Sequence, residues 1–182
     1  AFDRMRISIA GHQAQIHDLA FRDRLTGLPN RASFRQAVDE RIARDPHNGS
    51  MAVVMFGLDR FKHVNDVLGY AFGDRLLQAV AQRVAGEAVR GDDLIARLGG
   101  DEFALLLPRG DAQRGEDVAR RVAAALEQPL VLDDQAVDIS AGFGIACWPQ
   151  HGADADTLLG RAEVAMYTAK RKTVPCVVYD PA

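Results

Sequence analysis

Two adjacent carboxylates, Asp101 and Glu102, directly follow two glycines in the chain. Apolar runs over 94–98 and 103–107 flank this Gly-Gly-Asp-Glu segment, and the pattern predicts a tight β-hairpin. A carboxylate beside glycines at a strand end can hold a hard cation such as Mg²⁺, which carries phosphate groups. One glycine is enough to reverse the chain, so the second suggests that another molecule approaches the backbone. A solvated hairpin is the alternative, because Asp and Gly are ordinary turn residues.

The segments around this turn predict the elements that position it. Met51 to Leu58 is continuously apolar and predicts a central strand that is buried on both faces. The expected helices cover residues 31–44, 61–68, 74–89, 112–128 and 154–172, and further strands cover 130–132, 137–146 and 176–179. Helices that alternate with strands around one hairpin indicate an α/β fold, with a mixed sheet flanked by helices.

The first residues form a separate segment. Apolar side chains in residues 1–20 recur at steps of three and four, which is the spacing of a coiled-coil seam. An amphipathic helix packed on its own domain has the same pattern, so both interpretations stay open. We expect a linker or signalling helix over 1–22 and one domain over 23–182. The absence of an initiator Met suggests a piece of a longer protein, so upstream sensor or membrane domains stay open.

Composition narrows the class of protein. The 182 residues suit one domain with a short extension, and 48% hydrophobic residues support a real core. A net charge of −3 gives no reason to expect nucleic acid or an anionic membrane as a partner. Cys147 and Cys176 lack metal-ligand spacing and are interpreted as buried thiols in a reducing cytosol. With no visible membrane span or signal peptide, we expect a cytoplasmic location, alone or as the cytoplasmic part of a membrane-bound protein.

Four motifs carry a resemblance to a known family. They are 23–31 (DRLTGLPNR), 59–66 (DRFKHVND), 69–74 (GYAFGD) and 99–103 (GGDEF). Together they resemble the GGDEF family of diguanylate cyclase domains, bacterial transferases that condense two GTP into the second messenger cyclic di-GMP. The resemblance covers roughly Asp23 to Tyr179. It implies a palm-like βαββαβ core of nucleotidyl-cyclase type with a central hairpin, and a homodimer in the active state, in which each subunit presents one GTP.

The resemblance implies a metal site, and the chain departs from it at one position. Asp101 and the backbone carbonyl of Leu58 match metal ligands for Mg²⁺ or Mn²⁺, and Glu102 matches a catalytic residue that activates the hydroxyl. Gly57 stands where the family usually has an aspartate, which predicts weakened metal affinity and weakened activity. Strand alternation places Asp59 on the face of Gly57, so partial compensation by Asp59 stays open.

The implied nucleotide contacts are mixed. Asn65 and Asp74 match residues that hydrogen-bond the guanine edge, with helix capping as their alternative role. The other matched substrate-binding residues are Lys62, Lys170, Gly99 and Gly100. The two lysines match phosphate contacts, although lone lysines are solvated by default.

Two family positions near the triphosphate differ in this chain. Val174 stands at a usual arginine position and Tyr70 at a common histidine position. The sequence leaves open whether Arg171 or Lys172 substitutes for that arginine. Guanine recognition is therefore expected to be intact, whereas the grip on the triphosphate is in question.

Arg90 and Asp93 form an R-x-x-D pattern just before the hairpin. By the resemblance this is an inhibitory site for the product cyclic di-GMP, and a surface ion pair is the alternative. Three functions follow: a cyclase with weakened activity, a regulatory module that binds GTP or cyclic di-GMP beside an attached domain such as a phosphodiesterase, or a dimerisation unit. The retained Asn65, Asp74 and Arg90 argue against the third.

Overall fold

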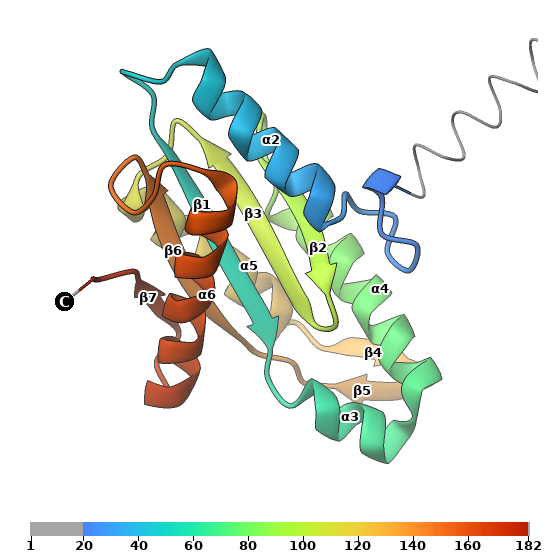
Figure 1. The fold of residues 1–182 in the computed structure, drawn as a ribbon. Helices are drawn as coiled ribbons and strands as arrows, with labels where there is room; N and C mark the ends of the chain where they lie inside the picture. The colour runs from blue at the N-terminus through green and yellow to red at the C-terminus, as the bar shows by residue number, and fades with distance from the viewer. Residues whose placement is uncertain (1–19, 182) are drawn as a thin grey trace, which may run out of the picture.

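The computed structural model describes residues 20–181. The linker or signalling helix expected over 1–22 therefore lies outside the described residues, apart from residues 20–22. Figure 1 shows a central sheet between two layers of helices. This arrangement confirms the predicted α/β fold with a mixed sheet.

Five strands form the main sheet, in the order β2-β3-β1-β6-β7. Their bounds are β1 (Met51–Leu58), β2 (Leu94–Gly99), β3 (Glu102–Pro108), β6 (Ala141–Trp148) and β7 (Cys176–Val178). Strand β7 runs parallel to β6, and the other neighbours are antiparallel. Every residue of β1 is buried, as predicted, because β3 and β6 flank it and helices cover both of its faces.

The helices pack in two layers (Figure 1). Helices α2 (Arg31–Arg44) and α6 (Ala155–Lys172) cover one face, and α4 (Tyr70–Glu87) and α5 (Ala112–Glu127) cover the other. Alternate side chains of β1 enter the two cores: Val54 packs with α4 and α5, and Val53 packs with α2 and α6. The short α3 (Phe61–Leu68) and a ribbon of β4 (Leu130–Leu132) and β5 (Gln135–Val137) lie at the same end of the sheet as the hairpin tip.

Two predicted boundaries are wrong. Helix α4 begins at Tyr70 and not at Asp74, and Gly73 lies inside it, so Gly73 does not interrupt the chain. The strand expected over 137–146 is split, because β5 ends at Val137 and β6 begins at Ala141. The segment between them carries Ser140 toward the end of β1, where it becomes part of the candidate site.

The cysteines are free thiols. Cys147 is buried as predicted, whereas Cys176 is only half-buried. Burial raises the pKa of both thiols to about 11. Neither is therefore a reactive thiolate near neutral pH. Within residues 20–181, no helix combines the length and the apolar character that a bilayer crossing requires.

Candidate functional site

The tip of the β2–β3 hairpin depends on its glycines. Gly99 has a φ of 138° and Gly100 a φ of 51°, and the pairing register shifts between Arg97 and Gly99. Residues with a side chain rarely adopt these backbone angles, so the bulged turn itself requires both glycines. The expectation that the second glycine marks a molecule close to the backbone is therefore not needed to explain it.

Arg97 fastens this tip to the first loop of the domain. Its Nε and Nη2 atoms donate to the carbonyl of Gly100 at 3.1 and 2.9 Å, and its Nη1 donates to Asp23 Oδ1 at 2.9 Å. Burial alone would raise the pKa of Asp23, but hydrogen bonds from Thr26 and the Arg97 guanidinium outweigh it and hold that pKa below its usual value. The hairpin tip is thus positioned by a charged residue of its own strand.

The tip also contacts the end of β1. The Leu58 amide donates to the Asp101 carbonyl over 3.2 Å, and Gly57 pairs with Glu102 on one side and with Gly142 on the other. The structure therefore brings together Asp101, Glu102 and the end of β1, as the sequence predicted for carboxylates on neighbouring strand ends.

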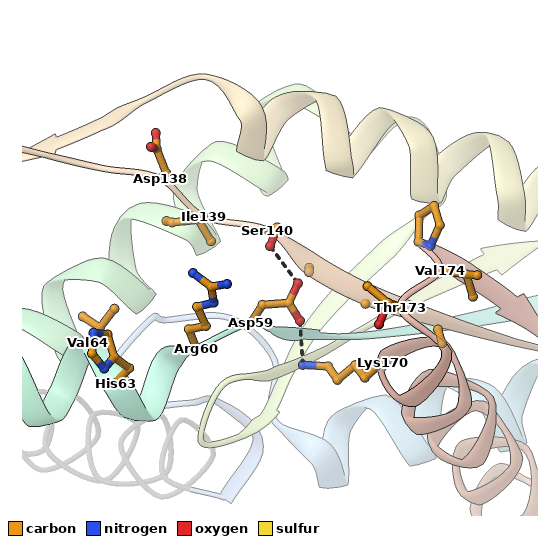
Figure 2. A pocket seen from close by; sticks show the side chains of 14 residues that line it. Asp59, Arg60, His63, Val64, Asp138, Ile139, Ser140, Lys170, Thr173 and Val174 are labelled. Carbon is orange, nitrogen blue, oxygen red and sulfur yellow. Dashed lines mark hydrogen bonds and ion pairs between the residues drawn. The ribbon is translucent and has the colours of Figure 1, made fainter.

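Lys170 of α6 occupies the space beside Gly57. A Cβ atom built on Gly57 would lie 3.2 Å from Lys170 Nζ and 3.4 Å from Met166 Sδ. The ammonium donates to the Leu58 carbonyl over 3.2 Å and lies 3.4 Å from Asp59 Oδ1. Figure 2 shows Lys170 pointing at Asp59, with Ser140 on the opposite side of that carboxylate. A cationic side chain thus holds the carbonyl that the sequence assigned to a metal ion.

Asp59 has the orientation expected from strand alternation, but its carboxylate is already engaged. Ser140 donates to Oδ2 over 2.7 Å, and Lys170 lies against Oδ1. Within the part of the chain that the structure describes, no three His, Cys, Asp or Glu side chains are grouped so as to hold a metal ion. The residues present fit a divalent cation poorly, since Gly57 offers no carboxylate and an ammonium adjoins the Leu58 carbonyl.

Glu102 is held by α6 as well. The hydroxyl of Tyr167 donates to Glu102 Oε1 over 2.9 Å. This hydrogen bond, together with the negative charge of Glu102, raises the pKa of Tyr167 to about 12, and Asp101 adds to the effect. The Tyr167 hydroxyl therefore fixes Glu102 against α6.

A cavity of about 780 Å³ opens beside Lys170 (Figure 2). The polar side chains on its wall are Asp59, Arg60, His63, Asp138, Ser140, Lys170 and Thr173. Lys170 lines it, together with Asp59, the carboxylate that the sequence offered as partial compensation for Gly57. The other predicted residues lie outside this cavity, on α3, on α4, at the hairpin tip, at the buried end of β1 (Leu58) and in the turn before β2 (Arg90 and Asp93).

The predicted guanine-binding residues meet where α3 joins α4. A Cβ built on Gly73 would lie 1.8 Å from Asn65 Oδ1, so the amide takes the space of a missing side chain. Asn65 Oδ1 is buried and has no hydrogen-bond partner among the described residues. The alternative of helix capping is not supported, because the first turn of α4 has no described side-chain cap. Asp74 and Lys62 are both exposed.

The predicted product site has one buried member. Asp93 is 8% exposed, and Arg114 of α5 donates to its Oδ1 over 2.7 Å. Asp93 Oδ2 is buried and has no hydrogen-bond partner within the described part of the chain. Arg90 is exposed, and its carbonyl accepts the Asp93 amide in the turn that precedes β2.

Sequence reasoning missed several residues of this region. Tyr167 could have been found, because it lies three residues before Lys170 on α6 and shares its helix face. Ser140, Arg60 and Arg114 gave no such signal, since each meets its surroundings only through the tertiary fold.

The sequence of this chain matches one protein family and several curated proteins. The family model "Diguanylate cyclase, GGDEF domain" matches residues 20–174. The chain is 42% identical over 163 residues to the diguanylate cyclase TpbB of Pseudomonas aeruginosa strain UCBPP-PA14, covering 87% of this chain and 37% of that protein. It is 37% identical over 158 residues to the cyclic di-GMP phosphodiesterase PdeR of Escherichia coli K12, covering 87% of this chain and 24% of that protein.

The fold of this chain also matches a solved structure of the same family. The GGDEF domain of PA1120 (YfiN or TpbB) from Pseudomonas aeruginosa superposes with a TM-score of 0.81 at 38% identity, covering 86% of this chain and 99% of that one. The chain thus spans well under half the length of the curated relatives but nearly the whole of an isolated domain.

Proposed function

We propose that this chain, which belongs to the GGDEF family of diguanylate cyclase domains, binds guanine nucleotides as part of a longer signalling protein and has only weakened cyclase activity. The observation that carries the proposal is the buried, unpaired amide oxygen of Asn65. A buried acceptor without a partner costs about 1–3 kcal/mol, and a ligand donor that reaches it recovers that cost. A turn of the amide about its Cβ–Cγ bond would present it to the guanine N1–H or amino group.

Two further features support a nucleotide at this place. Asp74 is exposed on the first turn of α4 and can accept from guanine donors. The first turn of α3 carries no described side-chain cap, so its backbone N–H groups are available to phosphate oxygens. Lys62 lies in that same turn and is exposed. A guanine between α3 and α4 with its phosphates toward the start of α3 uses all of these groups.

Catalysis is expected to be weak because of the end of β1. GGDEF diguanylate cyclases generally depend on Mg²⁺, and here Gly57 removes one carboxylate while Lys170 donates to the Leu58 carbonyl. Mg²⁺ or Mn²⁺ would therefore meet Asp101 and few other protein oxygens. With a fitting donor set such an ion neutralises phosphate charge.

Residual cyclase activity is supported by the intact hairpin. In the condensation, the 3′-hydroxyl of each GTP attacks the α-phosphorus of the other, so that two P–O bonds form, two bonds to pyrophosphate break, and each hydroxyl gives up its proton. The position of Asp101 and Glu102 beside the end of β1 supports a role for them in this step. Because each domain presents one GTP, the reaction needs two copies of the chain.

The remaining partners belong to the longer protein. We propose cyclic di-GMP as a second ligand at Arg90 and Asp93, an upstream sensor domain, and an attached phosphodiesterase domain as the regulated partner. The phosphodiesterase PdeR, which carries a similar segment, supports the last of these. The expected location is the cytoplasm, where GTP is available.

Titration of the chain with GTP and with ATP in a calorimeter tests the proposal. GTP is expected to bind at least about tenfold more tightly than ATP, which corresponds to roughly 1.4 kcal/mol. Incubation with GTP at several protein concentrations, followed by chromatography, measures any cyclic di-GMP formed. Equal affinity for the two nucleotides would rule out the proposed guanine pocket, whatever the turnover.

A further inference from the structure

The side chain of Lys170 lies across the sheet at a place where two neighbouring strands both have glycine. Gly57 and Gly142 are direct cross-strand neighbours of β1 and β6. A Cβ on Gly142 would lie 2.7 Å from Lys170 Cγ, and one on Gly57 would lie 3.2 Å from Lys170 Nζ. The stem of Lys170 therefore lies flat across the sheet, because neither strand has a side chain there. Its ammonium ends at the carboxyl end of β1.

The oxygens around this ammonium are those that a metal ion would use. They are the Leu58 carbonyl at 3.2 Å and Asp59 Oδ1 at 3.4 Å, and Ser140 fixes the second oxygen of Asp59. A carbonyl and a carboxylate at one strand end suit a hard divalent cation. They also suit an ammonium, and the positive charge of Lys170 at these oxygens disfavours a second cation beside it.

The Lys170 ammonium can still donate a hydrogen bond to a phosphate ligand. A lysine ammonium has three N–H donors; one is donated to the Leu58 carbonyl, and Asp59 Oδ1 lies at ion-pair distance. The remaining donor capacity of the ammonium faces the cavity beside it, where Arg60 and His63 also lie on the wall. Lys170 is 26% exposed, so the cavity can reach it.

We infer that Lys170 is a built-in cation that stands in the place of a divalent metal ion at the end of β1, so that guanine nucleotides bind this domain without a divalent metal. Two features act together. Gly57 provides no carboxylate to a metal ion, and the Lys170 ammonium beside it occupies the remaining oxygens. This inference rests on the proposed binding of GTP, and its test separates the two.

The first measurement compares GTP binding with and without metal. The chain is titrated with GTP in a calorimeter, once with excess EDTA and once with MgCl₂. The two dissociation constants are expected to agree within about twofold. A Mg²⁺-dependent tightening of about tenfold or more overturns the inference.

The second measurement removes the ammonium. Lys170→Met retains an apolar stem of similar length, and its affinity for GTP in EDTA is expected to fall at least about tenfold. Arg35→Met is the control, since Arg35 is an exposed cationic residue on α2 that pairs with Asp156 at the surface, and it should stay within about twofold of the unmodified chain. Equal GTP affinity of Lys170→Met and the control contradicts the inference.

The third measurement needs no nucleotide and decides the matter if GTP binds under neither condition. Mn²⁺ alone is titrated, with detection by electron paramagnetic resonance, into Gly57→Asp and into the double variant Gly57→Asp/Lys170→Met. Loss of the like charge is expected to raise Mn²⁺ affinity at least about tenfold. Equal Mn²⁺ affinity would place the ammonium away from the metal position and overturn the inference. Absence of GTP binding alone overturns only the proposed function.

Discussion

The hydroxyl of Tyr167 donates a hydrogen bond to Glu102 over 2.9 Å and so joins helix α6 to the tip of the β2–β3 hairpin. Lys170 lies one turn further along the same helix and reaches the end of β1. One face of α6 therefore contacts both the Glu102 carboxylate and the end of β1 at Leu58. A displacement of α6 would change both positions together.

The Tyr167 contact predicts an alkaline titration. Because the hydrogen bond to Glu102 raises the pKa of Tyr167 to about 12, above its usual value of 10.0, the neutral hydroxyl is favoured in the folded chain. Its contribution to stability is fully present below pH 10 and is lost as pH rises toward 12. We expect a late tyrosinate absorbance step at 295 nm that is missing in Tyr167→Phe. Glu102→Ala should move this step to lower pH, and an unchanged step would contradict the contact.

Gly57→Asp is expected to raise cyclic di-GMP synthesis by about tenfold or more, since it returns a carboxylate to the end of β1. The space permits it, because the nearest atoms to a Cβ there belong to the flexible side chains of Lys170 and Met166. Gly57→Asn, similar in size but uncharged, is the matched control and should stay near the unmodified rate. Product is measured by chromatography with GTP and Mg²⁺. Equal turnover by the unmodified chain and the aspartate variant would show that Gly57 does not limit the reaction.

The core of the fold could be predicted from sequence, whereas its junctions could not. The eight-residue apolar run of β1 predicts a central strand with the observed bounds, because continuous burial requires it. The start of α4 was misplaced, because a glycine such as Gly73 indicates a break unless a neighbouring side chain needs its space. Asn65 supplies that reason, and only the packing of α3 on α4 reveals it.

The candidate site divides in the same way. Motif spacing placed Asp101 and Glu102 at a turn, and the pairing of β3 with β1 sets Glu102 opposite Gly57 while the Asp101 carbonyl accepts the Leu58 amide. Lys170 was expected to contact phosphate, but its position on the Leu58 carbonyl depends on two glycines in different strands. Sequence alone does not reveal that Gly142 stands opposite Gly57, because the register of β6 is set by the whole sheet.

Guanine recognition yields a further prediction. Asn65→Ala and Asp74→Ala should each reduce the preference for GTP over ATP by about 1–3 kcal/mol, because each removes an acceptor from the guanine edge. Gly73→Ala should act in the same direction without touching a polar group, since its Cβ would collide with Asn65 Oδ1. Calorimetry with both nucleotides measures the preference. Retention of the full preference for GTP in all three variants would show that guanine does not bind between α3 and α4.

The ion pair between Asp23 and Arg97 predicts acid sensitivity of the hairpin. Hydrogen bonds and the nearby guanidinium lower the pKa of Asp23 below 3.8 despite its burial. The stability that this carboxylate contributes is therefore present above about pH 4 and is lost as pH falls through its lowered pKa. Denaturant midpoints measured from pH 7 down to pH 3 should fall less steeply in Asp23→Asn than in the unmodified chain. Parallel curves would show that Asp23 does not couple the pair to folding.

Cyclic di-GMP is expected to bind at Arg90. Arg90 is exposed beside a turn whose other end, Asp93, is buried against Arg114. This anchoring fixes the backbone below Arg90, so its guanidinium projects from a rigid segment that leads through β2 to Asp101. Charge-assisted hydrogen bonds to phosphate or guanine contribute about 1.5–3 kcal/mol each. Arg90→Ala should thus weaken cyclic di-GMP binding at least about tenfold and leave GTP affinity nearly unchanged.

Arg35→Ala is the control for this substitution, since Arg35 is an exposed arginine on α2 that pairs only with Asp156 at the surface among the described residues. Both variants and the unmodified chain are titrated with both nucleotides. If Arg90 serves only as a solvated surface charge, its loss alters neither ligand. No detectable cyclic di-GMP binding by the unmodified chain at tens of micromolar, about −6 kcal/mol on the affinity scale, would sink the assignment. In that case Asp93 and Arg114 are a structural pair that positions β2 against α5.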